Sequence, residues 1–211
     1  MGLKIDAAFQ RNDNQRVYFF IGEYVYRYDL EISDKLDAGY PQKIKDYWPG
    51  LPYDRVDAVF KANHADKLYF FSGNTYVRYD IYAEKVDEGY PKNIKENWHG
   101  VPYDAVDTAC ARMKVFVDID TEIFDKVLLF KGDEYVAYNL DIDRVADGYP
   151  KKIKDVLTGL PFDRFDAIFQ HLDHPLFYIF RGDEYIEYDF EFKKVKEGFP
   201  KKIADRWKGI G

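Results

Sequence analysis

The chain has 211 residues, a formal net charge of −7 and an aromatic content of 18%. The acidic balance argues against a nucleic-acid partner and against an anionic membrane surface, because phosphate groups are bound by concentrated Lys and Arg. The sequence contains neither an apolar stretch of transmembrane length nor an N-terminal run of signal-peptide length. We therefore expect no membrane insertion, and a protein that is cytoplasmic or exported without a visible signal peptide.

A short motif that begins with aspartate occurs four times along the chain. The copies are Asp6-Ala7-Ala8-Phe9, Asp57-Ala58-Val59-Phe60, Asp107-Thr108-Ala109-Cys110 and Asp166-Ala167-Ile168-Phe169. Their aspartates lie 51, 50 and 59 positions apart, with no Ser-rich or Pro-rich linker between them. A repeat length of about 50 residues, carried by the whole chain, indicates repeated supersecondary units in one array.

The first repeat opens with a short apolar segment from Lys4 to Phe9, followed by a polar turn. The run 16–21 then has the length and the aromatic content of a strand, and the run 24–28 repeats this pattern after Gly22. Two strand-like runs joined through a glycine predict a hairpin. A further short segment near 34–37 is expected to supply an outermost strand.

Each repeat ends in a segment with helical spacing. Gly39-Tyr40-Pro41 has counterparts at 89–91, 148–150 and 198–200. After it, Ile44, Tyr47 and Trp48 lie three and four positions apart, on one face of a helix, and Pro41 suits the first turn of that helix. Each repeat is therefore expected to hold three or four antiparallel strands and one short helix.

Four such units predict an all-β protein with short helices, a four-bladed β-propeller with one short helix per blade. A solenoid is the alternative, but its terminal repeats need distinct polar caps, and neither terminal repeat here differs from the inner ones. The expected blades of this single domain, 1–211, are 3–50, 51–100, 101–159 and 160–211. Closure of the ring is expected to pack the seam with Leu3, Ile5, Trp207 and Ile210.

The four Asp-Ala starts, the Gly-Tyr-Pro segments and Trp48-Pro49-Gly50-Leu51-Pro52 together resemble hemopexin-type repeats. Such repeats occur in haem-scavenging hemopexin, in matrix metalloproteinases, in vitronectin, in legume seed albumins and in bacterial hemopexin-like proteins. The resemblance covers residues 3–210 and implies a propeller with a funnel-like central tunnel.

The resemblance also implies ions in that tunnel. Backbone carbonyls of four residues are implied to hold calcium or sodium: Asp6, Asp57, Asp107 and Asp166. Backbone groups two residues further on are implied to hold a second ion or chloride: Ala8, Val59, Ala109 and Ile168. Four carbonyl dipoles around an axis form an oxygen site that suits a hard cation. Thr108, in place of alanine, should matter little because the backbone coordinates.

Cys110 is the single cysteine, so no disulfide can close the ring within the chain, as it does in many secreted members of the family that this chain resembles. It stands where the second repeat has Phe60, which favours a small buried core residue over a reactive thiol.

The third repeat contains an insertion. Between Asp107 and Gly132 lie 25 positions, against 16 between the corresponding residues of the other repeats. Insertions on one blade of a uniform ring are where partner specificity is expected, with a neutral loop extension as the alternative. The candidate partner-binding residues are Met113, Phe116, Asp118 and Asp120. An EF-hand-like calcium loop is disfavoured because the glycine and the final glutamate are missing.

No nucleophile and base pair stands out, and no catalytic residue is expected. His171 and His174 are close in sequence but lie in a polar turn, where solvated side chains are favoured over a metal or haem ligand.

We therefore expect a non-catalytic binding protein, a monomer or homodimer, that binds a protein or small molecule on one face. The alternatives are a haem or polyamine sensor or storage protein resembling the legume albumins, a toxin or defence protein, and an enzyme. Net charge −7 suits a cationic polyamine, whereas haem is only weakly implied.

Overall fold

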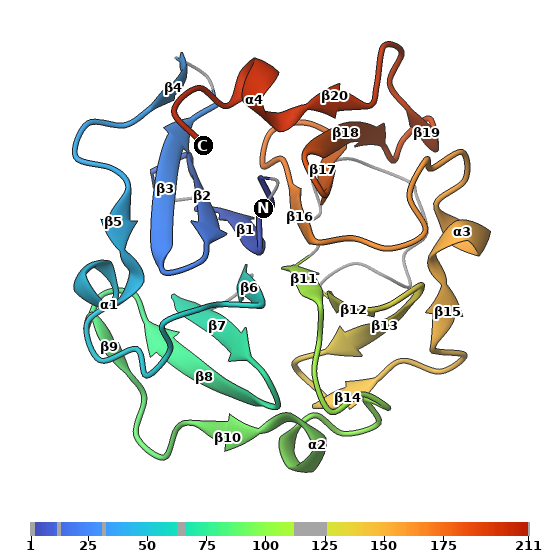
Figure 1. Cartoon of the computed structure of the whole chain (residues 1–211). Coiled ribbons are helices and arrows are strands. Elements are labelled where there is room, and N and C mark those ends of the chain that lie inside the picture. The colour runs from blue at the N-terminus through green and yellow to red at the C-terminus, as the bar shows by residue number, and fades with distance from the viewer. Residues whose placement is uncertain (1–2, 12–13, 31–32, 63–65, 112–125, 211) are drawn as a thin grey trace.

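A computed structural model describes residues 3–11, 14–30, 33–62, 66–111 and 126–210. It contains four antiparallel sheets, each built from one repeat, arranged around a central axis (Figure 1). The predicted four-bladed β-propeller is therefore confirmed. We number the blades one to four in chain order.

Within each blade the strands occupy equivalent places. The innermost strands are β1 (Ala7–Gln10), β6 (Ala58–Lys61), β11 (Thr108–Ala111) and β16 (Ala167–Gln170). The second strands are β2 (Arg16–Ile21), β7 (Lys67–Ser72), β12 (Lys126–Lys131) and β17 (Leu176–Arg181). The third strands are β3 (Tyr24–Asp29), β8 (Thr75–Asp80), β13 (Glu134–Asn139) and β18 (Glu184–Asp189).

Two short strands then pair with opposite ends of each third strand. The first set is β4 (Ser33–Leu36), β9 (Lys85–Val86), β14 (Arg144–Val145) and β19 (Lys194–Val195). The second set is β5 (Gln42–Lys43), β10 (Lys92–Asn93), β15 (Lys151–Lys152) and β20 (Lys201–Lys202). Each blade thus has five strands, where the sequence indicated three or four.

The second and third strands form the predicted hairpin. Ile21 pairs with Tyr24, so two residues make the turn, and Gly22 has a φ of 57°. Positive φ is easily reached by glycine and matches the turn type that suits the twist of a hairpin. The glycines at the same place in the other blades have φ between 57° and 59°.

One short helix closes each blade, at the rim of the propeller (Figure 1). The helices are α1 (Ile44–Tyr47), α2 (Ile94–Asn97), α3 (Ile153–Val156) and α4 (Ile203–Arg206). The expectation that Pro41 lies in the first helical turn is wrong. Gln42 and Lys43 first pair with β3, so the backbone stays extended for two residues after the proline, whose preceding peptide bond is cis.

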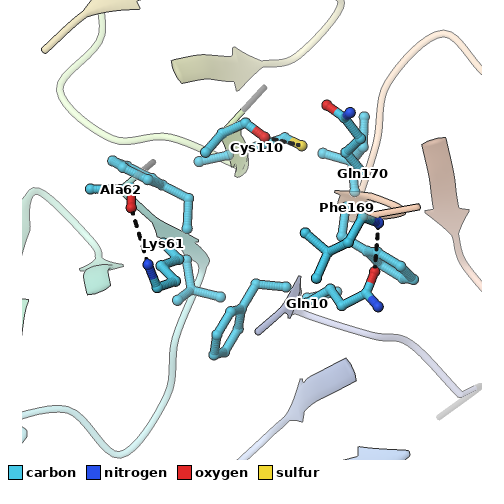
Figure 2. Close-up of a pocket in the computed structure, with 14 residues that line it drawn as sticks. Gln10, Lys61, Ala62, Cys110, Phe169 and Gln170 are labelled. Carbon is cyan, nitrogen blue, oxygen red and sulfur yellow. Dashed lines mark hydrogen bonds between the residues drawn. The ribbon is translucent and has the colours of Figure 1, made fainter. Parts of the chain in front are cut away.

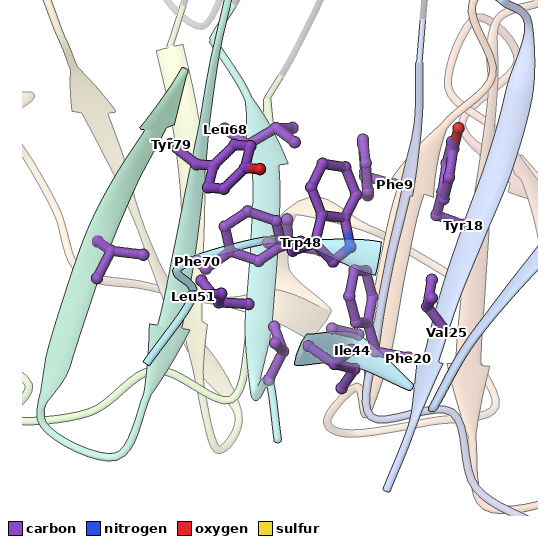
Figure 3. Packing of buried hydrophobic residues seen from close by; sticks show 14 of the residues in the cluster. Phe9, Tyr18, Phe20, Val25, Ile44, Trp48, Leu51, Leu68, Phe70 and Tyr79 are labelled. Atoms are coloured by element: carbon purple, nitrogen blue, oxygen red, sulfur yellow. The ribbon is translucent and has the colours of Figure 1, made fainter. Parts of the chain in front are cut away.

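The hydrophobic core lies between adjacent blades. Trp48, which follows α1, packs between blade one and blade two, with its ring 5.3 Å from Phe70 and 5.4 Å from Tyr79 (Figure 3). Such edge-on aromatic contacts add to the large apolar area that tryptophan buries. Trp98 and Trp207 take the same place at the next and at the last interface.

The seam between blades four and one is packed as the sequence predicted. Ile5, Trp207 and Ile210 are buried in one cluster, with Leu3 packed against it. The ring of Trp207 lies 4.7 Å from that of Phe19 in blade one. Every helix in the described part of the chain has four residues, too few to cross a membrane.

Candidate functional site

The four innermost strands surround a central tunnel. Each of β1, β6, β11 and β16 contacts the next around the axis, and β16 contacts β1 again (Figure 1). Two cavities open along this tunnel. A mouth pocket of about 400 Å³ lies where the strands begin, and an inner pocket of about 40 Å³ lies where they end.

The mouth pocket brings together the four aspartates that the sequence singled out. Asp6, Asp57, Asp107 and Asp166 all line it. Their backbone N–H groups donate to the carbonyl oxygen of the next-to-last residue of the adjacent second strand, at 2.8 to 2.9 Å. The four residues therefore occupy equivalent places at the starts of the innermost strands, around one opening.

The carboxylates of these aspartates have a structural role that the sequence did not predict. Each accepts a hydrogen bond from the backbone N–H of the turn glycine in its own blade. The pairs are Asp6 with Gly22 at 2.8 Å, Asp57 with Gly73 at 2.7 Å, Asp107 with Gly132 at 2.8 Å and Asp166 with Gly182 at 2.7 Å. A charged acceptor makes these bonds stronger than neutral ones, so each blade ties its first strand to its hairpin turn.

This bond explains why the aspartate and the glycine recur together. The insertion of blade three lies between Asp107 and Gly132, yet the bond of 2.8 Å is kept. The signal was present in the sequence as the constant distance of 16 residues in the other three repeats. Spacing alone did not tell which atoms meet.

Basic side chains also reach the mouth pocket. Lys131 Nζ lies 2.6 Å from the Asp107 carboxylate, and Arg181 Nη1 lies 2.5 Å from the Asp166 carboxylate. Lys4 Nζ lies 3.6 Å from Asp6 and 3.7 Å from Asp166. Asp166 is the most enclosed of the four carboxylates, with a side chain that is 6% exposed.

The inner pocket brings together the second predicted ring. Ala8, Val59, Ala109 and Ile168 all line it. Figure 2 shows polar side chains around them that the sequence did not suggest, from Gln10, Lys61 and Gln170. These residues stand at the same place in their repeats, directly after Phe9, Phe60 and Phe169, and this shared position is the signal that could have found them.

Hydrogen bonds hold parts of this polar ring in place. The Gln10 Oε1 atom accepts from the backbone N–H of Leu172 at 3.0 Å and so links blade one to blade four. Lys61 Nζ donates to the backbone oxygen of Ala62 at 3.4 Å (Figure 2). Cys110 is buried at the edge of this pocket, as predicted from its place in the repeat.

The histidine pair differs from its prediction. His174 is exposed, but His171 is only 3% exposed and its ring lies 4.5 Å from that of His174. The expectation of a solvated turn is therefore wrong for His171. Burial, and next the neighbouring His174, lower the pKa of His171 from 6.5 to about 4. Its Nδ1 accepts from the Asp173 N–H at 3.1 Å, which places the proton of the neutral ring on Nε2.

The remaining candidates fall outside the described residues or find no partners there. Met113, Phe116, Asp118 and Asp120 lie in 112–125, outside the described part of the chain. Within the residues that the structure describes, no group of three or more His, Cys, Asp or Glu side chains could hold a metal ion. A tunnel ion would therefore depend on backbone oxygens.

Comparison with known families gives one match. The family model described as Hemopexin matches residues 5–53, 56–103 and 165–211. The matched segments omit 104–164, which contain almost all of blade three and its insertion.

Curated relatives match over shorter segments. Matrix metalloproteinase-27 of Tupaia belangeri is 44% identical over 81 residues, which are 38% of this chain and 15% of that protein. Interstitial collagenase of Equus caballus is 42% identical over 76 residues, which are 36% of this chain and 15% of that protein. The matches therefore cover a small part of each relative.

Two solved structures share the whole architecture. A hemopexin fold protein, CP4 from cow pea, has a TM-score of 0.79 and 25% identity, and the alignment covers 97% of this chain and 96% of that one. A plant lectin with two metal binding sites, from Cicer arietinum, has a TM-score of 0.77 and 25% identity, with 96% and 95% covered. All four blades of this chain therefore have counterparts in a solved structure.

Proposed function

Because the chain belongs to the Hemopexin family, we propose that it is a non-catalytic binding protein whose propeller holds an ion in its tunnel and presents one face to a protein or small molecule. The observation that carries the proposal is the convergence of the four repeated aspartates at one opening. Their carboxylates are engaged by the turn glycines, which leaves the backbone carbonyls as the donors we assign to the ion.

The proposed cation is calcium or sodium. Backbone carbonyl oxygens are the ligands that hard cations prefer, and four of them from four equivalent strands fit such an ion. The nearby carboxylates add negative charge, which Lys4, Lys131 and Arg181 partly offset. The lectin from Cicer arietinum, whose fold matches along almost its whole length, has two metal binding sites, which supports an ion in this fold.

The backbone groups two residues after the aspartates support a second ion, either a cation or an anion. Ala8, Val59, Ala109 and Ile168 line the inner pocket, where only backbone groups of these residues can meet an ion. Lys61, at the same end of the tunnel, has a side chain that is 11% exposed, and its charge favours an anion such as chloride.

The first experiment is thermal unfolding of the full chain with and without a calcium chelator, with elemental analysis of the untreated protein. We expect about one tightly bound ion per chain. Because an ion that binds only the folded state raises the melting temperature, we also expect a lower melting temperature after chelation. A protein with no bound ion, and with no response to added calcium or sodium, would contradict the tunnel site.

A variant separates the carbonyl from the carboxylate. Asp57→Asn keeps the backbone oxygen and an acceptor for the Gly73 N–H, whereas Asp57→Ala removes that acceptor. We expect both variants to keep the ion and only Asp57→Ala to lose stability, by about 1 kcal/mol. Loss of the ion in Asp57→Asn would show that the carboxylate, not the carbonyl, is the ligand.

A polyamine ligand is the second candidate. The net charge of −7 favours a flexible cation. Haem is less well supported, since the buried His171 has Nδ1 engaged by a backbone N–H. Calorimetry with spermine and with haem tests this candidate, and saturable binding of either one would favour a small-ligand role over protein binding.

The proposal also holds that the protein has no catalytic activity and is a monomer or homodimer. Hydrolase or transferase turnover that disappears with one side-chain substitution would contradict the first part. The candidate partner-binding residues Met113, Phe116, Asp118 and Asp120 remain a prediction, which a comparison of the proteins retained by the full chain and by a variant that lacks 113–121 would test.

A further inference from the structure

The mouth pocket is displaced from the propeller axis toward blades three and four. Blade two contributes only Asp57 to its lining, and blade one contributes Lys4 and Asp6. The other lining residues come from blades three and four. A ring of equivalent blades would give a symmetric funnel, so side chains that differ between the repeats must create this offset.

The first difference is a small residue in blade three. Two positions before the aspartate, the repeats carry Lys4, Arg55, Ala105 and Arg164. Lys4 and Arg164 line the mouth pocket, Arg55 lies outside its lining, and blade three has only a methyl group at this position. Ala105 lines the pocket, and its methyl group leaves room there that a long side chain would fill.

The second difference adds cations next to that space. Directly before the turn glycine, the repeats carry Ile21, Ser72, Lys131 and Arg181. Only blades three and four have a basic residue here. Lys131 and Arg181 both line the mouth pocket and bond to the aspartate of their own blade.

The carboxylates on this side of the pocket are already satisfied. One oxygen of Asp107 accepts the Gly132 N–H and the other accepts Lys131. Asp166 is bonded in the same way to Gly182 and Arg181. These anions therefore have little capacity left to attract a further cation.

The basic groups, in contrast, have donors to spare. Arg164 is exposed, lines the pocket and makes no hydrogen bond or ion pair with any residue that the structure describes. Arg181 uses Nη1 for Asp166, and a guanidinium has five N–H donors. Two guanidinium groups and an ammonium thus surround a space next to Ala105.

We propose that the mouth pocket binds a small oxyanion, a carboxylate or phosphate group of a small molecule, between Lys131, Arg164 and Arg181. Guanidinium groups match the planar or tetrahedral arrangement of these oxygens and bind them with paired hydrogen bonds. The volume of about 400 Å³ is that of a small-molecule site. This inference rests on the proposed binding function and names the chemistry of its ligand.

The attraction is local. Lys4, Lys131, Arg164 and Arg181 line the pocket together with the four aspartates, so the pocket as a whole is close to neutral. The protein as a whole is acidic, so anions are not drawn to it over long distances. Selectivity then depends on how the donors are placed, and variants of equal charge but different position can test it.

The test is calorimetric titration of the full chain with inorganic phosphate and, separately, with succinate, at constant ionic strength. Arg164→Gln removes one guanidinium from the pocket. Arg55→Gln is the matched control, because it removes the same exposed group from the same repeat position of blade two, outside the pocket lining. We expect Arg164→Gln to weaken binding by about tenfold and Arg55→Gln to leave it within about twofold.

A second variant tests the space rather than the charge. Ala105→Arg gives blade three the long basic residue that Arg55 and Arg164 represent in their blades. It adds a positive charge, so attraction by net charge alone would strengthen binding. We expect it to abolish binding instead, because the side chain fills the pocket.

The possible results of these titrations differ in what they say about the ligand. Saturable binding of phosphate alone identifies a phosphoryl ligand, and binding of succinate alone identifies a carboxylate ligand; both support the inference. Lack of binding of either anion, equal losses in Arg55→Gln and Arg164→Gln, or unchanged binding in Ala105→Arg would overturn it. Elemental analysis of the same samples shows whether the tunnel ion is present, so a failed oxyanion site can be told from a failed ion site.

Discussion

The interface between blades one and two and the interface between blades three and four use the same backbone with opposite distributions of side-chain volume. At the first, Phe9, Tyr18 and Trp48 of blade one meet Val56, Leu68 and Ile81 of blade two. At the second, Cys110, Leu128 and Leu157 of blade three meet Phe165, Phe177 and Phe190 of blade four. At these positions the larger side chains belong to blade one at the first interface and to blade four at the second.

The exchange is confined to one interface. At the three positions that blade four fills with phenylalanine, every other blade has valine, isoleucine or leucine. Protein cores are packed as densely as organic crystals, so volume lost on one side must be supplied from the other. At these positions, large side chains of one blade therefore offset small side chains of the other.

Polar side chains at equivalent positions also differ between the blades. Arg27 of blade one pairs with Asp37 at 2.6 Å, and blade three has Ala137 and Ala146 at these positions. The backbone bond that joins the two positions is present in both blades, at 2.9 and 2.8 Å. Blade four reverses the charges, with Glu187 and Lys196 2.7 Å apart. The same backbone hydrogen bond thus forms with different kinds of side-chain pair at these two positions.

The largest expected effect comes from imposing the blade-three residue on the first interface. Trp48→Leu reproduces Leu157 opposite Leu68, which is too small to compensate, and should lower the free energy of unfolding by about 3 kcal/mol. Leu157→Ala, at a half-buried position, should cost about 1–2 kcal/mol. Urea denaturation measures both. Adding Leu68→Phe to Trp48→Leu should restore part of the loss, and a strictly additive or larger loss would refute the exchange of volume.

The reversed pair in blade four gives the next effect. The Glu187 side chain is 7% exposed and accepts from Lys196 at 2.7 Å and Arg206 at 2.8 Å. Glu187→Gln removes the buried carboxylate that both cations share and should cost about 2–3 kcal/mol. Lys196→Gln should cost less, because Lys196 is 46% exposed and Arg206 still pairs with the carboxylate. Equal losses in the two variants, measured by urea denaturation, would contradict this ranking.

Acid should weaken the interface between blades four and one through His171. Burial holds the pKa of His171 at about 4 in the folded state, below the ordinary 6.5, so the unfolded chain binds more protons between these values. The contribution of His171 to the free energy of unfolding is fully present above pH 6.5 and is lost as the pH falls toward 4. Between pH 7 and pH 5 this should lower the free energy of unfolding by about 2 kcal/mol.

The groups around His171 set this response. Burial is the main cause, His174 and Arg206 also disfavour its protonation, and Asp173 and Glu187 favour it. The measurement is urea denaturation at pH 7 and pH 5, with His171→Gln as the control. The control should lose most of the pH dependence in this range, and an unchanged dependence would assign it to other groups.

The smallest expected effect lies at the interface between blades three and four. Phe177→Leu restores the residue type that blade two has at this position, and should cost about 1 kcal/mol because Leu128 and Cys110 cannot fill the space. A shift of the urea midpoint without a change of slope is the expected observation. Increased stability would indicate that the side chains of this interface are overpacked.

Much of the fold could be predicted from the sequence because the same pattern occurs four times, so that each element is indicated by four independent copies. The hairpins, the rim helices and the seam followed from Gly22, Trp48, Trp207 and their counterparts. The start of α1 could not be placed correctly, because the pairing of Gln42 and Lys43 with β3 joins residues distant in sequence. His171 was likewise misplaced, because the burial of a turn depends on the blade beside it.

The candidate site divides in the same way. The identity of the four aspartates and the ring formed by Ala8 and its counterparts were predicted, and the structure places each set around one pocket. Which residues offer side chains to those pockets was not predictable. The offset of the mouth toward blades three and four depends on Ala105, Lys131 and Arg164, which lie on separate segments of the sequence and meet only at the tunnel.

The sequence by itself determined the number of blades, the order of strands within each and the residues that repeat, because local spacing and hydrophobic pattern are properties of each 50-residue unit. The tertiary structure alone decided what the spacing pattern does not contain: which blade supplies the larger side chains at each interface, which atoms join the aspartate to the turn glycine within a blade, and where donors are left over at the mouth. These properties depend on distances between atoms that are far apart in the sequence, which are fixed only when the strands pair and the ring closes.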